Sequence, residues 1–419
     1  MSDAPTGLPL SGVRVLDVTR FVSGPLATFF LASMGAEVIA VERPAGEQSR
    51  LLAPFGRPDG GSSATPVDGG MSVPYLKRGR GKRSVALAID GPDGRDLVRR
   101  LAGAADVFVE NSRPGVMSRL GIGYDDLSAL NPALVYTSIS GYGQRGPRSG
   151  APAMDQAVQA ASGLMAKTGF PDGPPVRSGA AVADFTSAAF AAMGVVAALR
   201  QRDQSGRGQH VDLSMLDVLT ALVWDEPVDH YAASGVPVRT GNADPRGAPI
   251  NVYPALDGWV AVTLTTSEQW AHLVVLMDRP EWAVTLPTIR ERAQHAAEID
   301  EAFALWSRTL PAEEVERLLI GIGVPASVVR DPGAARADEQ LAFRGLLEPL
   351  HHPAASEPSG FLGPRLPIAF EGRVERLAPA ELLGTSTTAV LTEWLGLDSA
   401  ELARLETAGI IATRRRASP

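Results

Sequence analysis

The segment Val13-Arg-Val-Leu-Asp-Val-Thr19 starts the pattern that decides the fold. It is short and rich in β-branched residues, which predicts a buried strand. Gly24-Pro25 then opens an apolar stretch that predicts a helix over residues 26–34, ended by Gly35. The run Glu37-Val-Ile-Ala-Val-Glu42 predicts a second strand. Strand, helix and strand in about thirty residues form a βαβ unit.

The same alternation continues along the first half of the chain. Further strands are predicted at residues 84–89, 106–110, 134–139 and 206–214. Helices are predicted at residues 92–101, 155–164 and 185–200. The last of these is very rich in Ala, so we expect it to be fully buried. Repeated alternation of strands and helices predicts an α/β fold with a parallel sheet covered on both faces.

The chain has 419 residues and is too long for one compact domain. Five of the six Trp lie at positions 224, 259, 270, 282 and 306, which indicates a second core. Within that region, Asp257-Gly258 predicts a hairpin turn between residues 250–253 and 259–264. A helix at residues 311–320 and a strand at residues 324–330 are predicted to follow.

Three other segments are less regular. Residues 50–81 show no periodicity and are predicted to be a long mobile loop. Residues 345–380 are Pro-rich and are typical of a connector. Asp398 and Glu401 have capping-box spacing for a last helix at 399–407, and the tail containing Arg414-Arg415-Arg416 is expected to be a solvated end.

The composition excludes several classes of protein. Hydrophobic residues are 45% and charged residues 21%, as in a folded soluble chain. There is no Cys, which excludes disulfides, thiolate metal sites and a Cys nucleophile. The six His form no H-E-x-x-H pair, so we expect no metal centre. The net charge of −8 gives no basic field for nucleic acid, and no stretch of about 18 uninterrupted apolar residues predicts a membrane span. With no signal peptide at the start, we expect a cytoplasmic protein.

The βαβ opening raises the question of dinucleotide binding. Glu42 lies where a ribose-binding acid would lie, but the loop over residues 19–25 lacks G-x-G-x-x-G. We therefore do not expect NAD or FAD. Arg43 is either one half of a surface Glu-Arg pair or a contact for a phosphorylated ribose.

A basic run is the next candidate for anion binding. It contains Lys77, Arg78, Arg80, Lys82 and Arg83. Such a run is typical of a solvated loop, and it can also attract a phosphate-bearing ligand. Arg113 and Arg119 are further candidate anion contacts.

Asp184 precedes the long Ala-rich helix and has two interpretations. It is either the N-cap of that helix or a poorly solvated carboxylate that acts as a nucleophile. A helix N-terminus favours the anionic form, so the two roles are compatible. Ser-His-Asp catalysis has little support, because no G-x-S-x-G is present and no His is expected near Ser138 or Ser140.

Several separate stretches resemble the class III CoA-transferases, the family of formyl-CoA transferase, carnitine CoA-transferase and α-methylacyl-CoA racemase. They are Ala36-Glu-Val-Ile-Ala-Val-Glu-Arg-Pro44, Val109-Glu-Asn-Ser-Arg-Pro-Gly115, Ser205-Gly-Arg-Gly-Gln-His-Val-Asp212 and Gly241-Asn242. The matches occur in the right order over nearly the whole chain. The resemblance implies an interlocked homodimer of chains, each with a Rossmann-like large domain and a smaller α+β domain. In this chain they are expected at residues 1–220, with a return at 336–419, and at 225–335.

The resemblance also implies a reaction and its residues. The catalytic Asp of the family falls on Asp184, which would exchange CoA between an acyl-CoA and a carboxylic acid through an aspartyl anhydride and an aspartyl-CoA thioester, without metal. The CoA contacts of the family fall on Val22, Ser23, Arg43, Leu87, Asp90, Asn111, Ser112, Arg113 and Arg119. Met154 is expected in the wall of the thioester pocket.

Some positions depart from the family pattern. Val22 replaces a Gln of formyl-CoA transferase, and Asp244-Pro-Arg-Gly-Ala-Pro249 replaces a run of glycines, which argues against formate and oxalate as substrates. Asp90 replaces a Lys that contacts CoA. Met154 replaces the His of the racemases and cannot act as a base. An α-methylacyl-CoA epimerase and a CoA-binding protein without turnover remain as alternatives to the transferase.

Overall fold

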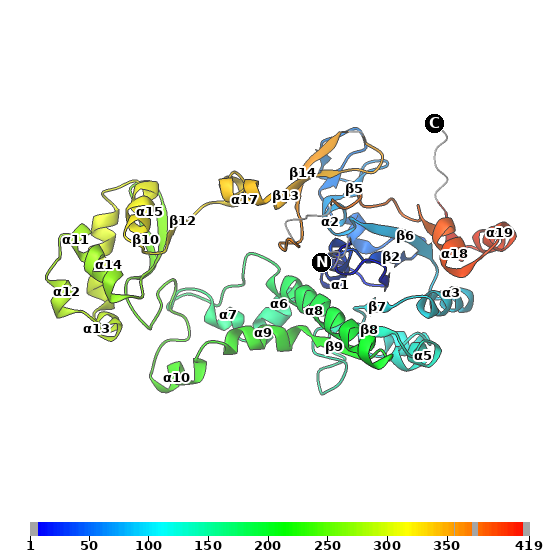
Figure 1. Cartoon of the computed structure of the whole chain (residues 1–419), viewed down its shortest axis with the longest axis horizontal. Coiled ribbons are helices and arrows are strands. Elements are labelled where there is room, and N and C mark those ends of the chain that lie inside the picture. Colours follow the sequence, from blue (N-terminus) through cyan, green and yellow to red (C-terminus); the bar gives the residue numbers. More distant parts are fainter. Residues whose placement is uncertain (1–6, 356, 371–375, 414–419) are drawn as a thin grey trace, which may run out of the picture. The chain divides into compact units, whose positions relative to one another are not determined.

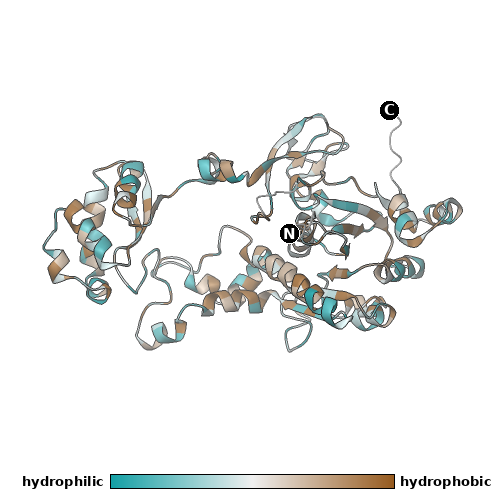
Figure 2. Cartoon of the chain, viewed as in Figure 1, coloured by the Kyte–Doolittle hydropathy of each residue, from teal (hydrophilic) through white to brown (hydrophobic). Residues whose placement is uncertain are grey.

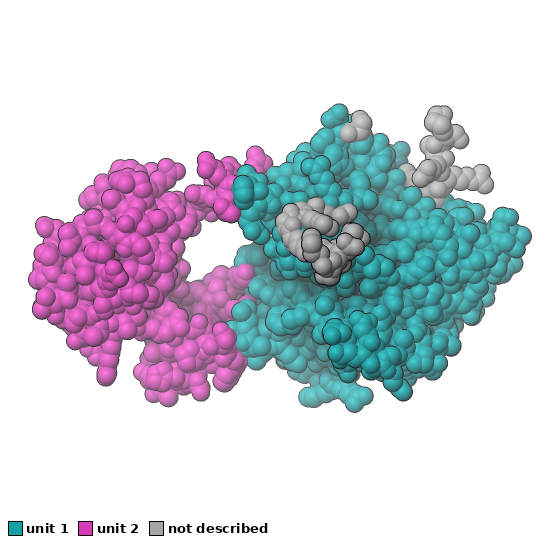
Figure 3. All heavy atoms as spheres, in the orientation of Figure 1, with its two compact units in different colours: residues 1–162, 179–222, 341–419 teal, residues 163–178, 223–340 magenta. Residues whose placement is uncertain are grey.

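The computed structural model describes residues 7–355, 357–370 and 376–413. The chain divides into two compact units (Figure 3). The first unit is formed by residues 1–162, 179–222 and 341–419, and the second by residues 163–178 and 223–340. The C-terminal part of the chain therefore belongs to the same unit as the N-terminal part. The tail at Arg414-Arg415-Arg416 lies outside the described residues.

A seven-stranded sheet forms the centre of the first unit within the described residues (Figure 1). Its order is β15 (Ile411–Ala412), β6 (Lys82–Leu87), β2 (Glu37–Glu42), β1 (Arg14–Asp17), β7 (Val107–Glu110), β8 (Val135–Ser140) and β9 (His210–Ser214). All neighbours are parallel except β15 and β6. The six parallel strands thus follow the order 3-2-1-4-5-6, and the winding reverses between β1 and β7. In such sheets, ligands bind outside the carboxyl ends of the strands at this point.

Helices cover both faces of the sheet, as the strand–helix alternation predicted. One group packs on the main core of the sheet: α3 (Pro92–Gly103), α5 (Tyr124–Leu130), α18 (Thr387–Leu395) and α19 (Ser399–Thr407). α1 (Ser23–Ser33) contacts β1, β2 and β7 and packs against α8 (Val182–Ser205), which also contacts β8 and β9. Asp398 accepts the backbone N–H of Glu401 at 2.8 Å, so the predicted cap of α19 is confirmed.

The prediction of a loop over residues 50–81 is wrong. The segment contains η1 (Gln48–Leu51), α2 (Val73–Arg78) and a small sheet of order β4 (Ser62–Ser63), β3 (Phe55–Gly56) and β5 (Met71–Ser72). Residues 345–380 likewise contain a hairpin of β13 (Leu347–His351) and β14 (Pro358–Pro364). Strands of two residues leave no periodicity to detect. Leu350 of the hairpin and Leu76 of α2 nevertheless share one buried cluster.

The second unit has a core of its own. The predicted hairpin is confirmed, because β10 (Ile250–Pro254) and β11 (Trp259–Thr263) pair antiparallel and β12 (Ala326–Val328) adds a third strand. The longer helices around this sheet are α11 (Ser267–Leu276), α14 (Ala296–Ser307) and α15 (Ala312–Gly321). Trp270 and Trp282 are stacked inside the core, whereas Trp259 is exposed. Shorter helices complete the unit: α7 (Leu164–Lys167), α10 (Val228–Ala233), α12 (Trp282–Thr285), α13 (Ile289–Gln294), α16 (Pro332–Ala335) and α17 (Glu339–Arg344, continuing across the unit boundary).

The expectation that the Ala-rich helix is fully buried is wrong. By length and composition alone, α8 is apolar enough to cross a membrane, but core helices of other proteins also meet this criterion. One side of α8 packs on α1, and the other leaves Phe190, Met193 and Val196 between 38% and 59% exposed. Phe185 is 47% exposed at the border of the two sides, and its ring contacts that of Phe30 in α1. Figure 2 shows apolar residues along this helix. α8 therefore presents an apolar face that the described chain does not cover.

Candidate active site

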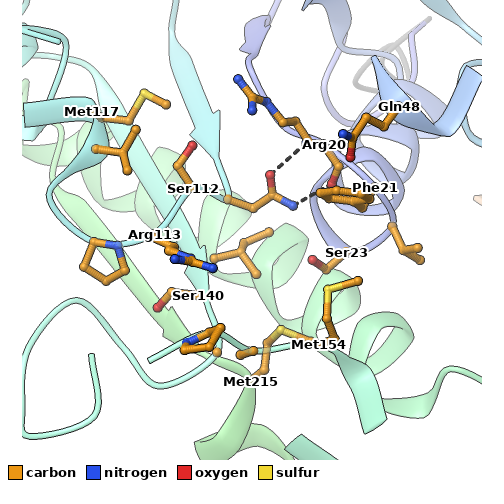
Figure 4. A pocket seen from close by; sticks show the side chains of 18 of the residues that line it. Arg20, Phe21, Ser23, Gln48, Ser112, Arg113, Met117, Ser140, Met154 and Met215 are labelled. Carbon is orange, nitrogen blue, oxygen red and sulfur yellow. Dashed lines mark hydrogen bonds between the residues drawn. The ribbon is translucent and has the colours of Figure 1, made fainter. Parts of the chain in front are cut away.

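A cavity of about 1040 Å³ lies at the carboxyl edge of the sheet in the first unit (Figure 4). The loops that follow β1, β2, β6, β7 and β8 form its walls, together with the first turn of α8 and the start of α9 (Met215–Trp224). This is the place that the strand order indicates for a ligand. Its size is sufficient for a large substrate.

Most of the residues expected at the site line this cavity. They are Val22, Ser23, Arg43, Asp90, Asn111, Ser112, Arg113, Arg119, Met154 and Asp184. Leu87 is the exception, because its side chain is 0% exposed and packs into the main core of the sheet. The last residue of β6 points inward and pairs with Ile411 of β15. The side chain of Leu87 therefore does not line the cavity, and a contact between the backbone of Leu87 and CoA stays a prediction.

The loop after β1 is held in an uncommon backbone conformation. Phe21 has φ +64°, in the left-handed region that a bulky residue seldom adopts. Three hydrogen bonds with two side chains hold the loop. The Asn111 side chain accepts the Arg20 N–H at 2.8 Å and donates to its carbonyl at 2.7 Å, and Glu47 accepts the Phe21 N–H at 3.0 Å. Strain maintained by its surroundings is typical of functional sites. The loop presents Ser23 to the cavity.

Asp184 occupies the third position of α8, so the N-cap interpretation is wrong. Ala181 stands at the cap position and makes no side-chain bond there. The carboxylate of Asp155 replaces the missing cap, accepting the backbone N–H groups of Ala183 at 2.7 Å and Asp184 at 3.2 Å. The Asp184 side chain is thus left available to the cavity. Nothing in the sequence near Asp184 indicates this cap, because Asp155 begins α6 (Asp155–Ala161).

The surroundings of Asp184 raise the pKa of its carboxyl to about 6. Burial is the largest cause, and the negative charge of Asp155 adds to it. The charge of Arg78 and interactions with Ser23 act in the opposite direction. At neutral pH the group is therefore still mainly a carboxylate, but a more basic one than an exposed Asp.

Four arginines give the cavity its positive charge. Arg20, Arg43, Arg113 and Arg119 line it, in positions from which guanidinium groups can bind phosphate oxygens. Burial, and the charge of Arg43, lower the pKa of Arg20. Arg43 forms an ion pair with Asp90 at 3.1 Å, in which both side chains are about half exposed. Asp90 therefore competes with any phosphate for Arg43.

The basic run over residues 77–83 is not a solvated loop. Arg80 pairs with Glu348, and Arg83 pairs with Glu37 and Glu393. Lys82 is buried, donating to Asp17 at 3.0 Å and to Thr28 at 2.7 Å. The interpretation as a solvated face is wrong because the run belongs to α2 and β6, which turn these cations inward.

A second buried carboxylate lies below the same edge of the sheet. Glu110 is 3% exposed, accepts the Ser112 N–H at 2.7 Å and interacts with Ser138. Burial raises its pKa to about 7. The expectation that no His is near Ser138 is wrong, since His210 Nε2 lies 2.9 Å from Ser138 Oγ. Ser138 is only 1% exposed and does not line the cavity, so this pair is not a nucleophile for a bound substrate.

The described residues offer no evident metal site. In the described ranges, no group of three or more His, Asp or Glu side chains is arranged to hold a metal ion. The polar groups that face the cavity are instead arginines, small hydroxyl and amide side chains, and the carboxylates of Asp90 and Asp184.

Known proteins resemble this chain over its full length. The family model described as CoA-transferase family III matches residues 10–385. The succinyl-CoA–D-citramalate CoA-transferase of Chloroflexus aurantiacus is 34% identical, covering 98% of this chain and 100% of that protein. Human succinyl-CoA:glutarate CoA-transferase is 32% identical, covering 98% of this chain and 91% of that protein. Among solved structures, a CAIB/BAIF family protein from Brucella suis has a TM-score of 0.78 and 30% identity, covering 93% of this chain and 100% of that one.

Proposed function

Because the chain belongs to CoA-transferase family III, we propose that it transfers CoA from an acyl-CoA thioester to a carboxylic acid, with Asp184 as the catalytic residue. One observation carries the assignment of Asp184. Its carboxylate faces the large cavity, lies in the first turn of α8 and has a pKa of about 6. A carboxylate that is poorly solvated yet ionised at neutral pH is a good nucleophile.

The first half of the reaction removes the acyl group from CoA. An oxygen of Asp184 attacks the thioester carbonyl carbon, the carbon–sulfur bond breaks and CoA leaves as a thiolate. The thiolate then attacks Cγ of Asp184 in the mixed anhydride. The anhydride bond to Cγ breaks, which releases the first acid as a carboxylate and leaves an aspartyl-CoA thioester.

The second half repeats these steps with the acceptor. Its carboxylate attacks Cγ, CoA leaves again as a thiolate, and the thiolate attacks the acceptor carbonyl. The new acyl-CoA departs and the Asp184 carboxylate is restored. No proton is gained or lost overall, so the reaction needs no acid–base pair. It does need water excluded from the anhydride, which an apolar cavity wall such as Met154, Met117 and Val22 favours.

The arginines of the cavity suit a CoA ligand. We place its phosphates near Arg20, Arg43, Arg113 and Arg119, which surround the mouth formed by the loops after β1, β2 and β7. The relatives from Chloroflexus aurantiacus and human are named for succinyl-CoA. We therefore propose succinyl-CoA as a donor and a small dicarboxylic acid as an acceptor.

We also propose that the protein is a homodimer of Rossmann-like large domains and smaller second domains. The uncovered apolar face of α8 supports this, since apolar patches of that kind mark interfaces. A second copy would bury Phe185, Phe190 and Met193. Sedimentation of the purified protein at micromolar concentration tests it, and a monomer under those conditions would refute it.

Trapping the covalent intermediate tests the transferase proposal. The protein is mixed with succinyl-CoA, quenched and measured by intact mass. We expect a covalent species heavier than the free protein by one CoA less one water, because the thioester replaces one carboxyl oxygen of Asp184, and hydroxylamine should discharge it. Asp184→Asn, compared at equal CoA binding, should form none of it. Failure to trap the species in the wild-type protein, with CoA still bound, would favour a binding protein without turnover.

The epimerase alternative is tested with a chiral 2-methylacyl-CoA in deuterated water. Epimerisation through a two-base pair needs a second base beside the substrate, and no His lines the cavity among the described residues. We expect no α-deuterium in the recovered thioester. Incorporation at a rate near that of CoA transfer would overturn this part of the proposal.

A further inference from the structure

Ser140, the last residue of β8, carries a buried hydroxyl that lacks a partner. The residue is 7% exposed, and its Oγ has no hydrogen-bond partner among the described residues. Of the buried polar side-chain atoms without a partner in the described parts of the chain, only Ser140 Oγ belongs to a residue that lines the large cavity. Burying a hydroxyl without a hydrogen bond costs free energy, so this hydroxyl is expected to find its partner in a ligand.

The residues that flank Ser140 are uncharged. Ile139 and Gly141 adjoin it in the chain and line the same cavity. Ser214 pairs with it across β9, and Met215, the next residue, also lines the cavity (Figure 4). A neutral donor in such surroundings suits a neutral oxygen of the ligand, because an anion placed there would need a counter-charge that these residues do not provide.

Direct contacts connect the end of β8 with the end of α8 that bears Asp184. A Cβ added at Gly141 would lie 2.0 Å from the Cβ of Ala153, so the residue after Ser140 packs closely on Ala153. Two residues further along the chain, Asp155 accepts the backbone N–H of Asp184 at 3.2 Å. Ser140 and Asp184 both line the large cavity. The hydroxyl without a partner and the proposed nucleophile therefore belong to adjoining parts of one cavity wall.

The proposed reaction places a negative charge on an oxygen that is neutral in the substrate. When the Asp184 carboxylate attacks the thioester, the carbonyl carbon becomes tetrahedral and an electron pair of the C=O bond moves onto its oxygen. The oxygen then returns this pair as the carbon–sulfur bond breaks and CoA leaves as a thiolate. A hydroxyl that donates to this oxygen bonds more strongly as the charge develops, so it stabilises the transition state more than the bound thioester.

We propose that the Ser140 hydroxyl donates a hydrogen bond to the acyl carbonyl oxygen of the thioester that Asp184 attacks, and thereby stabilises the oxyanion. This rests on the proposed function, because the oxyanion forms only if Asp184 acts as the nucleophile. In the second half of the reaction the same hydroxyl serves the acyl carbonyl of the acceptor when the thiolate attacks it. Ser140 keeps its proton throughout, so it is a hydrogen-bond donor and not a second nucleophile.

Rates of CoA transfer from succinyl-CoA to glutarate test the proposal. For Ser140→Ala we expect kcat to fall roughly 100-fold, as for the loss of one donor to an oxyanion. The Kd for CoA, measured by calorimetric titration, should change less than about twofold, because CoA has no acyl carbonyl. Ser140→Thr keeps a hydroxyl and should recover most of the loss. The Tm of Ser140→Ala should be no lower than that of the wild-type protein, because the hydroxyl has no partner to lose on substitution.

Ser187→Ala is the matched control. Ser187 follows Asp184 by three residues in α8, is 0% exposed, and has an Oγ without a partner among the described residues. It does not line the cavity. The same chemical change should therefore leave kcat within about threefold of the wild-type value. Equal losses in Ser140→Ala and Ser187→Ala would refute the proposal, because removal of a buried hydroxyl outside the cavity would then suffice.

The outcomes separate the role of Ser140 from the proposed function. If the wild-type protein forms the CoA adduct but Ser140→Ala keeps its kcat, the role of Ser140 is refuted and the transferase stands. Weaker CoA binding at unchanged kcat would place the hydroxyl against CoA itself and would also refute this role. A fall in kcat accompanied by a clearly lowered Tm would make Ser140 structural. If the wild-type protein binds CoA but forms no adduct, the transferase is refuted, and the role of Ser140 with it.

Discussion

Two carboxyl groups with raised pKa values lie at the same edge of the sheet and differ in what surrounds them. Glu110 lies beneath the edge with Ser112, Ser138 and the nearby His210, and it has no access to the cavity. Asp184 lies in the cavity wall, with its helix capped by another residue. Both have raised pKa values, about 7 for Glu110 and about 6 for Asp184.

A raised carboxyl pKa does not by itself identify a reactive group. Burial raises both values. What distinguishes Asp184 is that it lines the cavity, whereas Glu110 does not. Glu110 instead supports the loop that carries Asn111 and Ser112 into the cavity.

Removing the charge of Asp184 should lower kcat far more than removing the charge of Glu110. We expect Asp184→Asn to lower kcat for CoA transfer at least about a thousandfold, because the nucleophile is lost. Glu110→Gln resembles the protonated form of Glu110 and should cost less than about tenfold. Both variants are compared by initial rates of acyl-CoA formation. An equal loss of kcat in the two variants would contradict the assignment of Asp184, and not Glu110, as the reacting carboxylate.

Glu110 should make the free energy of unfolding depend on pH. Its pKa is raised from 4.5 to about 7 on folding, so the folded protein holds this proton more tightly than the unfolded chain. The resulting stabilisation is complete below pH 4.5 and is lost as the pH rises through about 7. We expect the free energy of unfolding of the wild-type protein, relative to Glu110→Gln, to fall by about 3 kcal/mol between pH 4.5 and 8. Urea unfolding at several pH values measures it, and a difference that does not vary with pH would contradict this account.

Asp155 should control both the position and the pKa of Asp184. Transfer needs the carboxylate form, so kcat/KM should decline as the pH falls through about 6. Asp155→Asn removes the charge that raises the pKa of Asp184, so the decline should move to lower pH. Asp155→Ala also removes the acceptor for two backbone N–H groups and should cost about tenfold in rate. A decline that moves to higher pH in Asp155→Asn would contradict the assignment.

The smallest effect concerns the exposed pair at the cavity. Asp90→Asn should free Arg43 and tighten CoA binding two- to fivefold, about the value of an exposed ion pair. Asp93→Asn removes a charge close by in α3 without touching Arg43 and serves as the control. Calorimetric titration with CoA measures both. Unchanged or weaker binding in Asp90→Asn would remove Arg43 from the CoA contacts.

The strands and helices of the first unit were predictable because their signals are local. β2 occupies the predicted residues 37–42, and β1, β7 and β8 lie within one or two residues of the predicted ends. The small sheet of β3, β4 and β5 was not predictable, since its pairing is a tertiary property of two-residue segments. The exposed side of α8 was also missed, because an Ala-rich sequence looks equally suited to burial on every face.

The site was predictable only through the resemblance of whole motifs. From the sequence alone, Asp184 could be either a helix cap or a nucleophile. The sequence does not indicate that Asp155, which lies 29 residues earlier, caps the same helix end. His210 and Ser138 are 72 residues apart and meet because β8 and β9 are neighbours. Sequence reasoning also could not show that the Leu87 side chain points away from the cavity, because the direction of a strand's last side chain depends on the core behind it.

Oxygen labelling shows whether the Asp184 carboxylate exchanges an oxygen with the acceptor acid during transfer. An acceptor acid with ¹⁸O in both carboxylate oxygens attacks Cγ of the aspartyl-CoA thioester. The thiolate then cleaves the anhydride at the acceptor carbonyl, so the bridging oxygen stays on Cγ. The regenerated Asp184 carboxylate must therefore carry one ¹⁸O. After single turnover from the aspartyl-CoA adduct and proteolysis, we expect a mass increase of about 2 Da in the peptide containing Asp184 and in no other, since each exchange of ¹⁶O for ¹⁸O adds that amount. New acyl-CoA formed without label in this peptide would contradict catalysis by Asp184.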